Sequence, residues 1–271
     1  MGVPAIRLIA LDLDGTLLTP ERKLSRRSIE ALRMAQSSGL TVCLASGRAV
    51  STIRPFANEA GVVGPMVSAN GAYLLNAEGK EILHRGLAPH VIQWLLEFAQ
   101  ERSVHVNHYL REGITMSQES QWGDLYRQRV ASDQAPVPVG EINRQDATKI
   151  LYIGAEAEMD VLESEVRGMI HPDWATIVRS EAEYLEFLPS GISKGWGLMK
   201  LAEHLGIAQE ETAALGDYSN DLEMIQWAGF AGAMGNALEE VKAEADVIVS
   251  DNRSDGAAEF IDLVLQRVPS C

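Results

Sequence analysis

The chain has 271 residues, of which 46% are hydrophobic and 23% charged, which is enough apolar material for a globular core in two domains. Its formal net charge of −15 excludes the basic surface that nucleic-acid binding requires. No apolar run approaches the roughly 20 residues of a membrane span, and no secretory signal is recognisable. We therefore expect a cytoplasmic protein without a nucleic-acid or membrane partner, and no obligatory protein partner is evident.

The first eighty-odd residues alternate apolar strands with amphipathic helices, a pattern typical of a parallel α/β sheet. The first strand starts at Ile6 and is expected to carry Asp12 and Asp14. Ser25 is the expected N-cap of the following helix, and Gly39 ends that helix. Next come an apolar strand over residues 40–45, a helix over 50–59 and a strand over 65–69.

Residues 85–187 have a different pattern, with a helix at 90–100 and strand-like segments at 104–108 and 114–117. After them the core pattern returns, with an amphipathic helix around Leu198 and strands at 212–215 and 246–249. The sequence therefore predicts a doubly wound, Rossmann-like α/β core made of residues 1–84 and 188–271. Residues 85–187 are expected to form an inserted α+β domain.

Two cysteines, Cys43 and Cys271, are too few for a disulfide framework, and Cys43 lies in an apolar run where we expect it to be buried. His105 and His108 are three residues apart in a predicted strand. They should point to opposite faces, which makes a shared metal site unfavourable and favours packing roles.

The first predicted strand ends in Asp12-Leu13-Asp14-Gly15-Thr16. Residues two apart in a strand share a face, so Asp12 and Asp14 would bring like charges together unless a cation lies between them or one is protonated. Both conditions suit metal-assisted phosphoryl transfer. The alternative is an ordinary Asp-Gly turn that closes a strand.

Two further strands also end in polar clusters, which in a parallel sheet line the same edge. Ser46 and Gly47 precede a helix, whose N-terminus can hold an anionic oxygen, although Ser46 taken alone favours the simpler role of an N-cap. Asp217 and Asp221 are expected on one face at a helix start, where they suit Mg²⁺ or form a doubled acidic cap.

Lys194 is predicted at the start of the helix around Leu198, where a cation opposes the helix dipole. A nearby anion would explain it, whereas an exposed lysine near a helix end would need no explanation.

Together these elements resemble the haloacid dehalogenase (HAD) superfamily of phosphotransferases, in particular its Cof-type branch, subfamily IIB. The resemblance spans nearly the whole chain. One small departure is Ala257, where the family usually has a β-branched residue. The matching motifs are Asp12-Leu13-Asp14-Gly15-Thr16, Ser46-Gly47-Arg48, Asn70-Gly71-Ala72, Lys194-Gly195, Gly216-Asp217, Asn220-Asp221, Met234-Gly235-Asn236-Ala237, Ala245-Asp246 and Asp255-Gly256-Ala257.

The resemblance implies Mg²⁺-dependent hydrolysis of small phosphorylated metabolites through an aspartyl-phosphate on Asp12, with Asp14 as general acid and base. It implies that Mg²⁺ is held by Asp12, the Asp14 carbonyl and Asp217, with Asp221 close behind. Phosphoryl contacts would come from Lys194 and from three further residues. Those residues are Ser46, Gly47 and Asn220.

The resemblance also implies that residues 85–187 form a mobile cap of the large α/β class, which sets substrate selectivity through residues 104–118. Sugar phosphates, nucleotide monophosphates and pyridoxal phosphate all remain open as substrates. A phosphomutase that uses the same intermediate is one alternative. A non-catalytic sensor of a phosphorylated ligand is another, although such a sensor would not need the acid–base carboxylate of Asp14.

Overall fold

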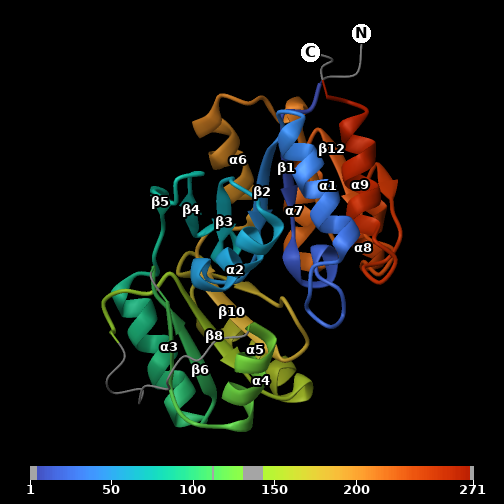
Figure 1. The fold of residues 1–271 in the computed structure, drawn as a ribbon. Coiled ribbons are helices and arrows are strands. Elements are labelled where there is room, and N and C mark those ends of the chain that lie inside the picture. The colour runs from blue at the N-terminus through green and yellow to red at the C-terminus, as the bar shows by residue number, and fades with distance from the viewer. Residues whose placement is uncertain (1–4, 112, 131–142, 269–271) are drawn as a thin grey trace. The chain divides into compact units, whose positions relative to one another are not determined.

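The computed structural model describes residues 5–111, 113–130 and 143–268, so Cys271 lies outside the described residues. The chain divides into two compact units, each described here by itself (Figure 1). The first comprises residues 1–46, 53–83 and 193–271, and the second comprises residues 47–52 and 84–192. Within the described ranges, no helix is both long and apolar enough to cross a membrane.

The first unit is built on an eight-stranded sheet. Its strands are β1 (Leu8–Leu11), β2 (Thr41–Ala45), β3 (Met66–Ser68), β4 (Tyr73–Leu75), β5 (Glu81–His84), β11 (Thr212–Gly216), β12 (Phe230–Ala233) and β13 (Val247–Ile248). They lie in the order β13-β12-β11-β1-β2-β3-β4-β5. The pairs from β13 to β3 are parallel, and β4 is antiparallel to β3. The chain winds outward from β1 in both directions, which confirms the predicted doubly wound sheet.

Helices cover this sheet, α1 packing against α9 and α6 against α7, as a parallel sheet requires. The Ser25 hydroxyl accepts the Ser28 amide at 2.9 Å, which confirms the predicted N-cap of α1. The helices of the core pattern are α1 (Arg26–Ser37), α2 (Val50–Ala60), α6 (Lys194–Leu205), α7 (Leu222–Trp227), α8 (Glu239–Glu244) and α9 (Gly256–Leu265).

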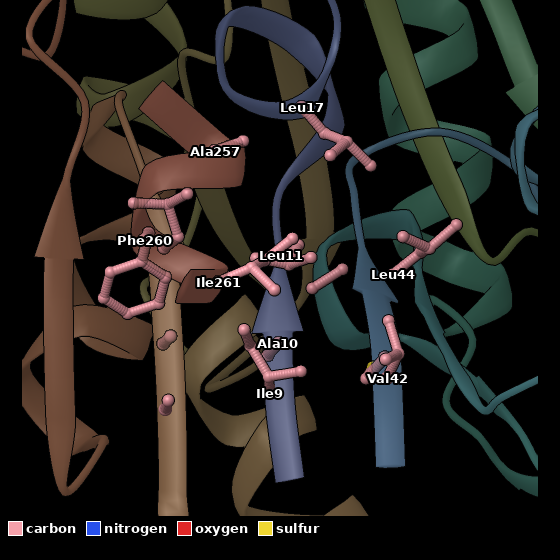
Figure 2. Close-up of a cluster of buried hydrophobic side chains, with 14 of the residues drawn as sticks. Ile9, Ala10, Leu11, Leu17, Val42, Leu44, Ala257, Phe260 and Ile261 are labelled. Carbon is pink, nitrogen blue, oxygen red and sulfur yellow. The ribbon is translucent and has the colours of Figure 1, made fainter. Parts of the chain in front are cut away.

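The hydrophobic core of the first unit is centred on β1, all of whose residues are buried. A strand covered on both faces reads as a continuous apolar run, which is why Leu8–Leu11 lacks polar alternation. Figure 2 shows Ile9 and Leu11 of β1 among Val42 of β2 and Phe260 of α9. Cys43 is also buried, as predicted, and burial raises the pKa of its thiol to about 12.

The second unit has a five-stranded antiparallel sheet in the order β7-β6-β8-β10-β9. Its strands are β6 (His105–Tyr109), β7 (Ile114–Met116), β8 (Lys149–Ile153), β9 (Ala175–Val178) and β10 (Tyr184–Pro189). Its helices are α3 (Pro89–Glu101), α4 (Gln121–Val130) and α5 (Glu156–Met169). Side chains of α3 and α5 pack on one sheet face, and Tyr126 of α4 packs on the other.

His105 and His108 both lie in β6 and are buried. Their partners across the sheet are Ile153 and Ile150, which belong to two different hydrophobic clusters. The two imidazoles therefore point to opposite faces, as the alternation of a strand predicts.

Several strand boundaries differ from those predicted, and two of the differences leave polar residues outside a strand. β1 ends at Leu11, so Asp12 and Asp14 lie beyond the strand and its alternation does not place them. β13 contains only Val247 and Ile248, and the Asp246 carboxylate accepts the Ala231 amide at 2.8 Å. The Asp246 side chain replaces a ladder contact at the start of β13. β1 ends because the chain turns away from the sheet in the segment Leu13–Leu17.

Candidate functional site

Three neighbouring strands of the first unit end at the same edge of the sheet. β1 lies between β2 and β11, and all three run in parallel. Asp12, Ser46 and Asp217 are the residues that directly follow these strands. Their convergence confirms that the predicted polar clusters share one edge, where open α/β sheets bind ligands.

A tight turn follows Asp12. Gly15 has φ +85°, and a Cβ built on it would lie 2.2 Å from the Asp217 carboxylate, so a larger residue would displace that side chain. The Thr16 hydroxyl donates to Asp217 Oδ1 at 2.6 Å, and the Asn236 amide donates to the Gly15 carbonyl at 2.9 Å. The turn therefore packs directly against the Asp217 carboxylate, and the Thr16 hydrogen bond fixes the orientation of that carboxylate.

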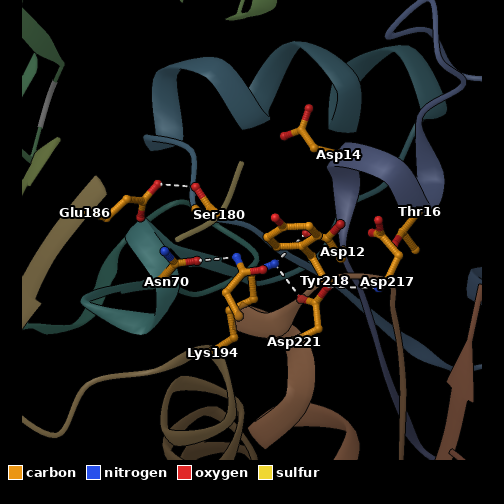
Figure 3. Close-up of polar contacts among 12 residues, drawn as sticks. Asp12, Asp14, Thr16, Asn70, Ser180, Glu186, Lys194, Asp217, Tyr218 and Asp221 are labelled. Atoms are coloured by element: carbon orange, nitrogen blue, oxygen red, sulfur yellow. Dashed lines mark hydrogen bonds and ion pairs between the residues drawn. The ribbon is translucent and has the colours of Figure 1, made fainter. Parts of the chain in front are cut away.

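Lys194 forms the centre of a buried charge cluster (Figure 3). Its ammonium nitrogen lies 2.6 Å from Asp12 Oδ1 and 2.6 Å from Asp221 Oδ1. The two carboxylates are the nearby anions that would explain a lysine at the N-terminus of a helix. The side chain is only 2% exposed, so it is not a surface lysine.

The ionisation of this cluster is strongly perturbed. Burial raises the pKa of Asp12 to about 7, although Lys194 opposes the rise. Burial and the neighbouring carboxylates raise the pKa of Asp217 well above its ordinary value. Burial alone would lower the pKa of Lys194, but Asp12 and Asp221 raise it. Ionised together, these three carboxylates would carry more negative charge than one ammonium neutralises, which is why burial and their mutual repulsion favour protonation.

A cation would balance this charge. Asp12, Asp217 and Asp221 each offer a carboxylate oxygen, and the three oxygens lie within 4.8 Å of one another. Hard oxygen donors of this kind suit a divalent ion such as Mg²⁺ or Ca²⁺. The donor set, the burial and the excess negative charge all fit a divalent metal ion.

Asp14 does not belong to this carboxylate group. It lies in the turn after β1, and its side chain is 27% exposed. Its Oδ1 accepts a hydrogen bond from the Arg22 guanidinium at 2.8 Å. Figure 3 shows its carboxylate apart from those of Asp12 and Asp217. The predicted sharing of one strand face is therefore wrong, because the chain leaves the strand before Asp14.

Asp217 and Asp221 are brought together by the short 3-10 helix Ser219–Asp221 and not by one face of an α-helix. The α7 helix begins only at Leu222. The Asp221 carboxylate turns back to accept the amides of Asp217 and Tyr218, at 3.0 and 3.1 Å. The prediction that they share one face of a helix is therefore wrong, but the two carboxylates do lie close together as expected.

Ser46 and Asn220 meet through Asn70. The Asn70 amide donates to the Ser46 carbonyl at 3.0 Å, and the Asn220 side-chain amide donates to Asn70 Oδ1 at 3.0 Å. Gly47 groups with the second unit, where its carbonyl accepts Lys149 at 2.6 Å. The helix expected after Ser46 and Gly47 begins at Val50.

Sequence reasoning assigned no role to Thr16 or Asn70. The available signals were a hydroxyl directly after an Asp-X-Asp-Gly turn and an Asn-Gly pair directly after a strand. Both are turn signals, and only the structure shows which functional side chains they hold.

Comparison with known proteins identifies the family. Residues 9–261 match the model of the haloacid dehalogenase-like hydrolases. Pyridoxal phosphate phosphatase YbhA of Escherichia coli is 32% identical over 94% of this chain and 97% of its own length. The 5-amino-6-(5-phospho-D-ribitylamino)uracil phosphatase YitU of Bacillus subtilis is 28% identical, over 94% and 96%.

A solved haloacid dehalogenase-like hydrolase from Bacteroides thetaiotaomicron has the same fold, with a TM-score of 0.85 and 33% identity. The similarity covers 96% of this chain and 99% of that structure. The chain belongs to the haloacid dehalogenase-like hydrolases, as a phosphatase of the Cof type.

Proposed function

We propose that this protein hydrolyses small phosphorylated metabolites in a Mg²⁺-dependent reaction that forms an aspartyl-phosphate on Asp12. The observation that carries the proposal is the buried cluster of Asp12, Asp217 and Asp221, in which Lys194 contacts Asp12 and Asp221. An excess of buried carboxylates is costly to folding, and it is useful where a metal ion and a phosphoryl group bind together.

In the first step, an oxygen of Asp12 attacks phosphorus and forms an acyl-phosphate bond while the bond from phosphorus to the leaving oxygen breaks. Asp14 gives its proton to that oxygen. In the second step, Asp14 takes a proton from water, the water oxygen attacks phosphorus, and the Asp12 carboxylate is released with inorganic phosphate. The partial exposure of Asp14 suits a group that exchanges protons with water, and its contact with Arg22 holds the carboxylate in the turn.

Lys194 supplies positive charge beside Asp12, and its two ion pairs orient it before substrate arrives. Ser46, Gly47 and Asn220 are proposed to donate hydrogen bonds to the phosphoryl oxygens. Fixed donors in a buried site stabilise the charge that spreads over these oxygens during transfer.

Asp12, Asp217 and Asp221 would hold the metal ion, with the Asp14 backbone carbonyl as a further oxygen ligand. When bound, Mg²⁺ supplies charge neutralisation for the transferring phosphoryl group. The Thr16 hydrogen bond orients the Asp217 carboxylate for this role.

Residues 85–187 are proposed to be the cap that selects the substrate, with residues 104–118 supplying selectivity. The names of the relatives guide the choice of compounds, since YbhA is a pyridoxal phosphate phosphatase and YitU acts on a phosphorylated ribitylamino-uracil. Pyridoxal phosphate, sugar phosphates and nucleotide monophosphates therefore form the test panel.

The test measures phosphate release from this panel by the wild type and by Asp12→Asn, with Mg²⁺ and with EDTA. We expect Mg²⁺-dependent release by the wild type and a loss of about 10⁴-fold or more in kcat for Asp12→Asn. The variant is checked for deamidation by mass spectrometry. Substantial turnover by the intact variant would exclude Asp12 as nucleophile, and conversion without phosphate release would indicate a phosphomutase.

A further inference from the structure

The three residues Ala69, Asn70 and Gly71 adopt an unusual backbone conformation directly after β3. Their φ angles are +48°, +52° and +96°, all in the left-handed region. Ala69 and Asn70 are 2% and 1% exposed, so this is not a loose surface turn. Consecutive left-handed residues persist only where the surrounding structure holds them, and such strain concentrates at functional sites.

The same three residues contact the elements that carry three proposed phosphate-binding groups. The Asn70 backbone amide donates to the carbonyl of Ser46, and the Asn70 side chain accepts the amide of Asn220. Gly71 lies against the first turn of α6, since a Cβ there would be 2.1 Å from the Ser193 carbonyl. Lys194 is the next residue along α6.

We propose that Asn70 is a positioning residue that acts through Asn220 and Ser46. The Asn220 amide has two N–H donors, and the one directed to Asn70 Oδ1 fixes the plane of the amide. We assign the second N–H to a phosphoryl oxygen. This inference rests on the proposed function, because it takes Ser46 and Asn220 as phosphate ligands.

The choice of residue type at position 70 supports this role. Asparagine tolerates the left-handed backbone and presents an uncharged acceptor. Aspartate would also accept the Asn220 amide, but it would add a further negative charge to a unit that already buries Asp12, Asp217 and Asp221. Glycine would keep the backbone bond to Ser46 and lose only the side-chain contact.

The test is a double-mutant cycle with Asn70→Gly, Asn220→Ala and the double variant. The readouts are KM, kcat and the inhibition constant of orthophosphate, all with saturating Mg²⁺. Each single substitution should raise the inhibition constant of orthophosphate about tenfold, which corresponds to the loss of one hydrogen bond to a charged group. The double variant should bind orthophosphate as well as the single variant that binds it less tightly, because Asn70 acts through Asn220.

The control is Ser103→Gly, which replaces another left-handed residue (φ +55°) in the second unit. It should leave the inhibition constant of orthophosphate unchanged. Urea unfolding of each variant separates folding from positioning. A lowered midpoint for Asn70→Gly with an unchanged inhibition constant would mean that Asn70 only shapes the turn.

The other outcomes are equally distinct. If the two single losses multiply to about a hundredfold in the double variant, Asn70 does not act through Asn220 and the inference is wrong. If the wild type itself neither hydrolyses any compound of the panel nor binds orthophosphate, the proposed function fails, and the role of Asn70 fails with it.

Discussion

The two units each bury a lysine, and the two lysines have different surroundings. In the first unit, Lys194 contacts Asp12 and Asp221, with Asp217 as a third carboxylate in the same group. In the second unit, Lys149 pairs with the carboxylate of Glu186 at 2.9 Å. Both lysine side chains are almost completely buried.

The surroundings of Lys149 satisfy its charge and its hydrogen bonds. Besides Glu186, its ammonium donates to the Gly47 carbonyl at 2.6 Å and lies 4.2 Å from the centre of the Tyr109 ring. The second oxygen of Glu186 accepts the Ser180 hydroxyl at 2.6 Å. The Lys149–Glu186 pair balances one charge against one, whereas the Lys194 group sets three carboxylates against one ammonium.

The difference indicates how a buried ion pair with a purely structural role can be distinguished from the charge cluster of a functional site. A balanced pair satisfies itself and needs no ligand. In the Lys194 group the charges are unbalanced, and burial raises the pKa of Asp12 to about 7. The rest of the fold holds these carboxylates together, and a bound cation would lower the electrostatic cost of their closeness. Four predictions test this distinction, from the largest expected effect to the smallest.

Lys194→Met should reduce kcat/KM by about 10³-fold, because it removes the fixed positive charge beside Asp12. The measurement is steady-state hydrolysis of the best substrate of the panel with Mg²⁺, on samples shown to be folded by circular dichroism. Near-wild-type turnover of the folded variant would mean that the Lys194 group is as structural as the Lys149 pair.

Lys149→Met should lower the free energy of unfolding by about 3–5 kcal/mol, because it removes the ammonium that offsets the buried charge of Glu186. Lys149→Met/Glu186→Leu should recover most of that loss, since an apolar pair of similar volume needs no charge balance. Urea unfolding of the three proteins measures both effects. A double variant as unstable as the single one would contradict the view of a self-contained pair.

The second unit should also lose stability in acid through His108. Burial lowers the pKa of this imidazole from 6.5 to about 4, against a smaller opposing effect of Asp146. Between these values the unfolded chain binds a proton that the folded chain does not. The free energy of unfolding should therefore fall by about 3 kcal/mol from this residue as the pH falls through that window.

The measurement for His108 is urea unfolding at about pH 7 and about pH 4.5, in the wild type and in His108→Asn. The variant should show a smaller fall in stability between the two conditions. An equal fall in both proteins would mean that other groups account for the acid sensitivity.

Two glycines with the same backbone conformation provide the finest comparison. Gly15 has φ +85° and Gly39 has φ +86°, but only at Gly15 would an added Cβ meet another group, the Asp217 carboxylate. Gly39→Ala should cost about 1–2 kcal/mol of stability and leave kcat/KM unchanged. Gly15→Ala should add a loss of about 10²-fold in kcat/KM by displacing Asp217. Equal kinetics for the two variants would argue against a role for Asp217.

Much of this architecture was predictable, because local chemistry determines it. The apolar run before Asp12 makes a buried parallel strand, Ser25 caps α1, and the change of pattern after the first eighty-odd residues matches the change from the parallel to the antiparallel sheet. The site residues that follow strands were found for the same reason, since parallel strands deliver their carboxyl ends to one edge.

Other features depend on contacts between residues far apart in the chain, and sequence spacing does not encode them. Spacing suggested that Asp14 would share a face with Asp12, but the strand ends first and Asp14 pairs with Arg22. Lys194 is 182 residues from Asp12 in sequence, and only the packed sheet brings them within 2.6 Å. The sequence by itself determined the strands, the caps and the chemistry at each strand end. Only the tertiary structure decided which charges share one buried volume, because burial and charge balance are properties of the assembled core.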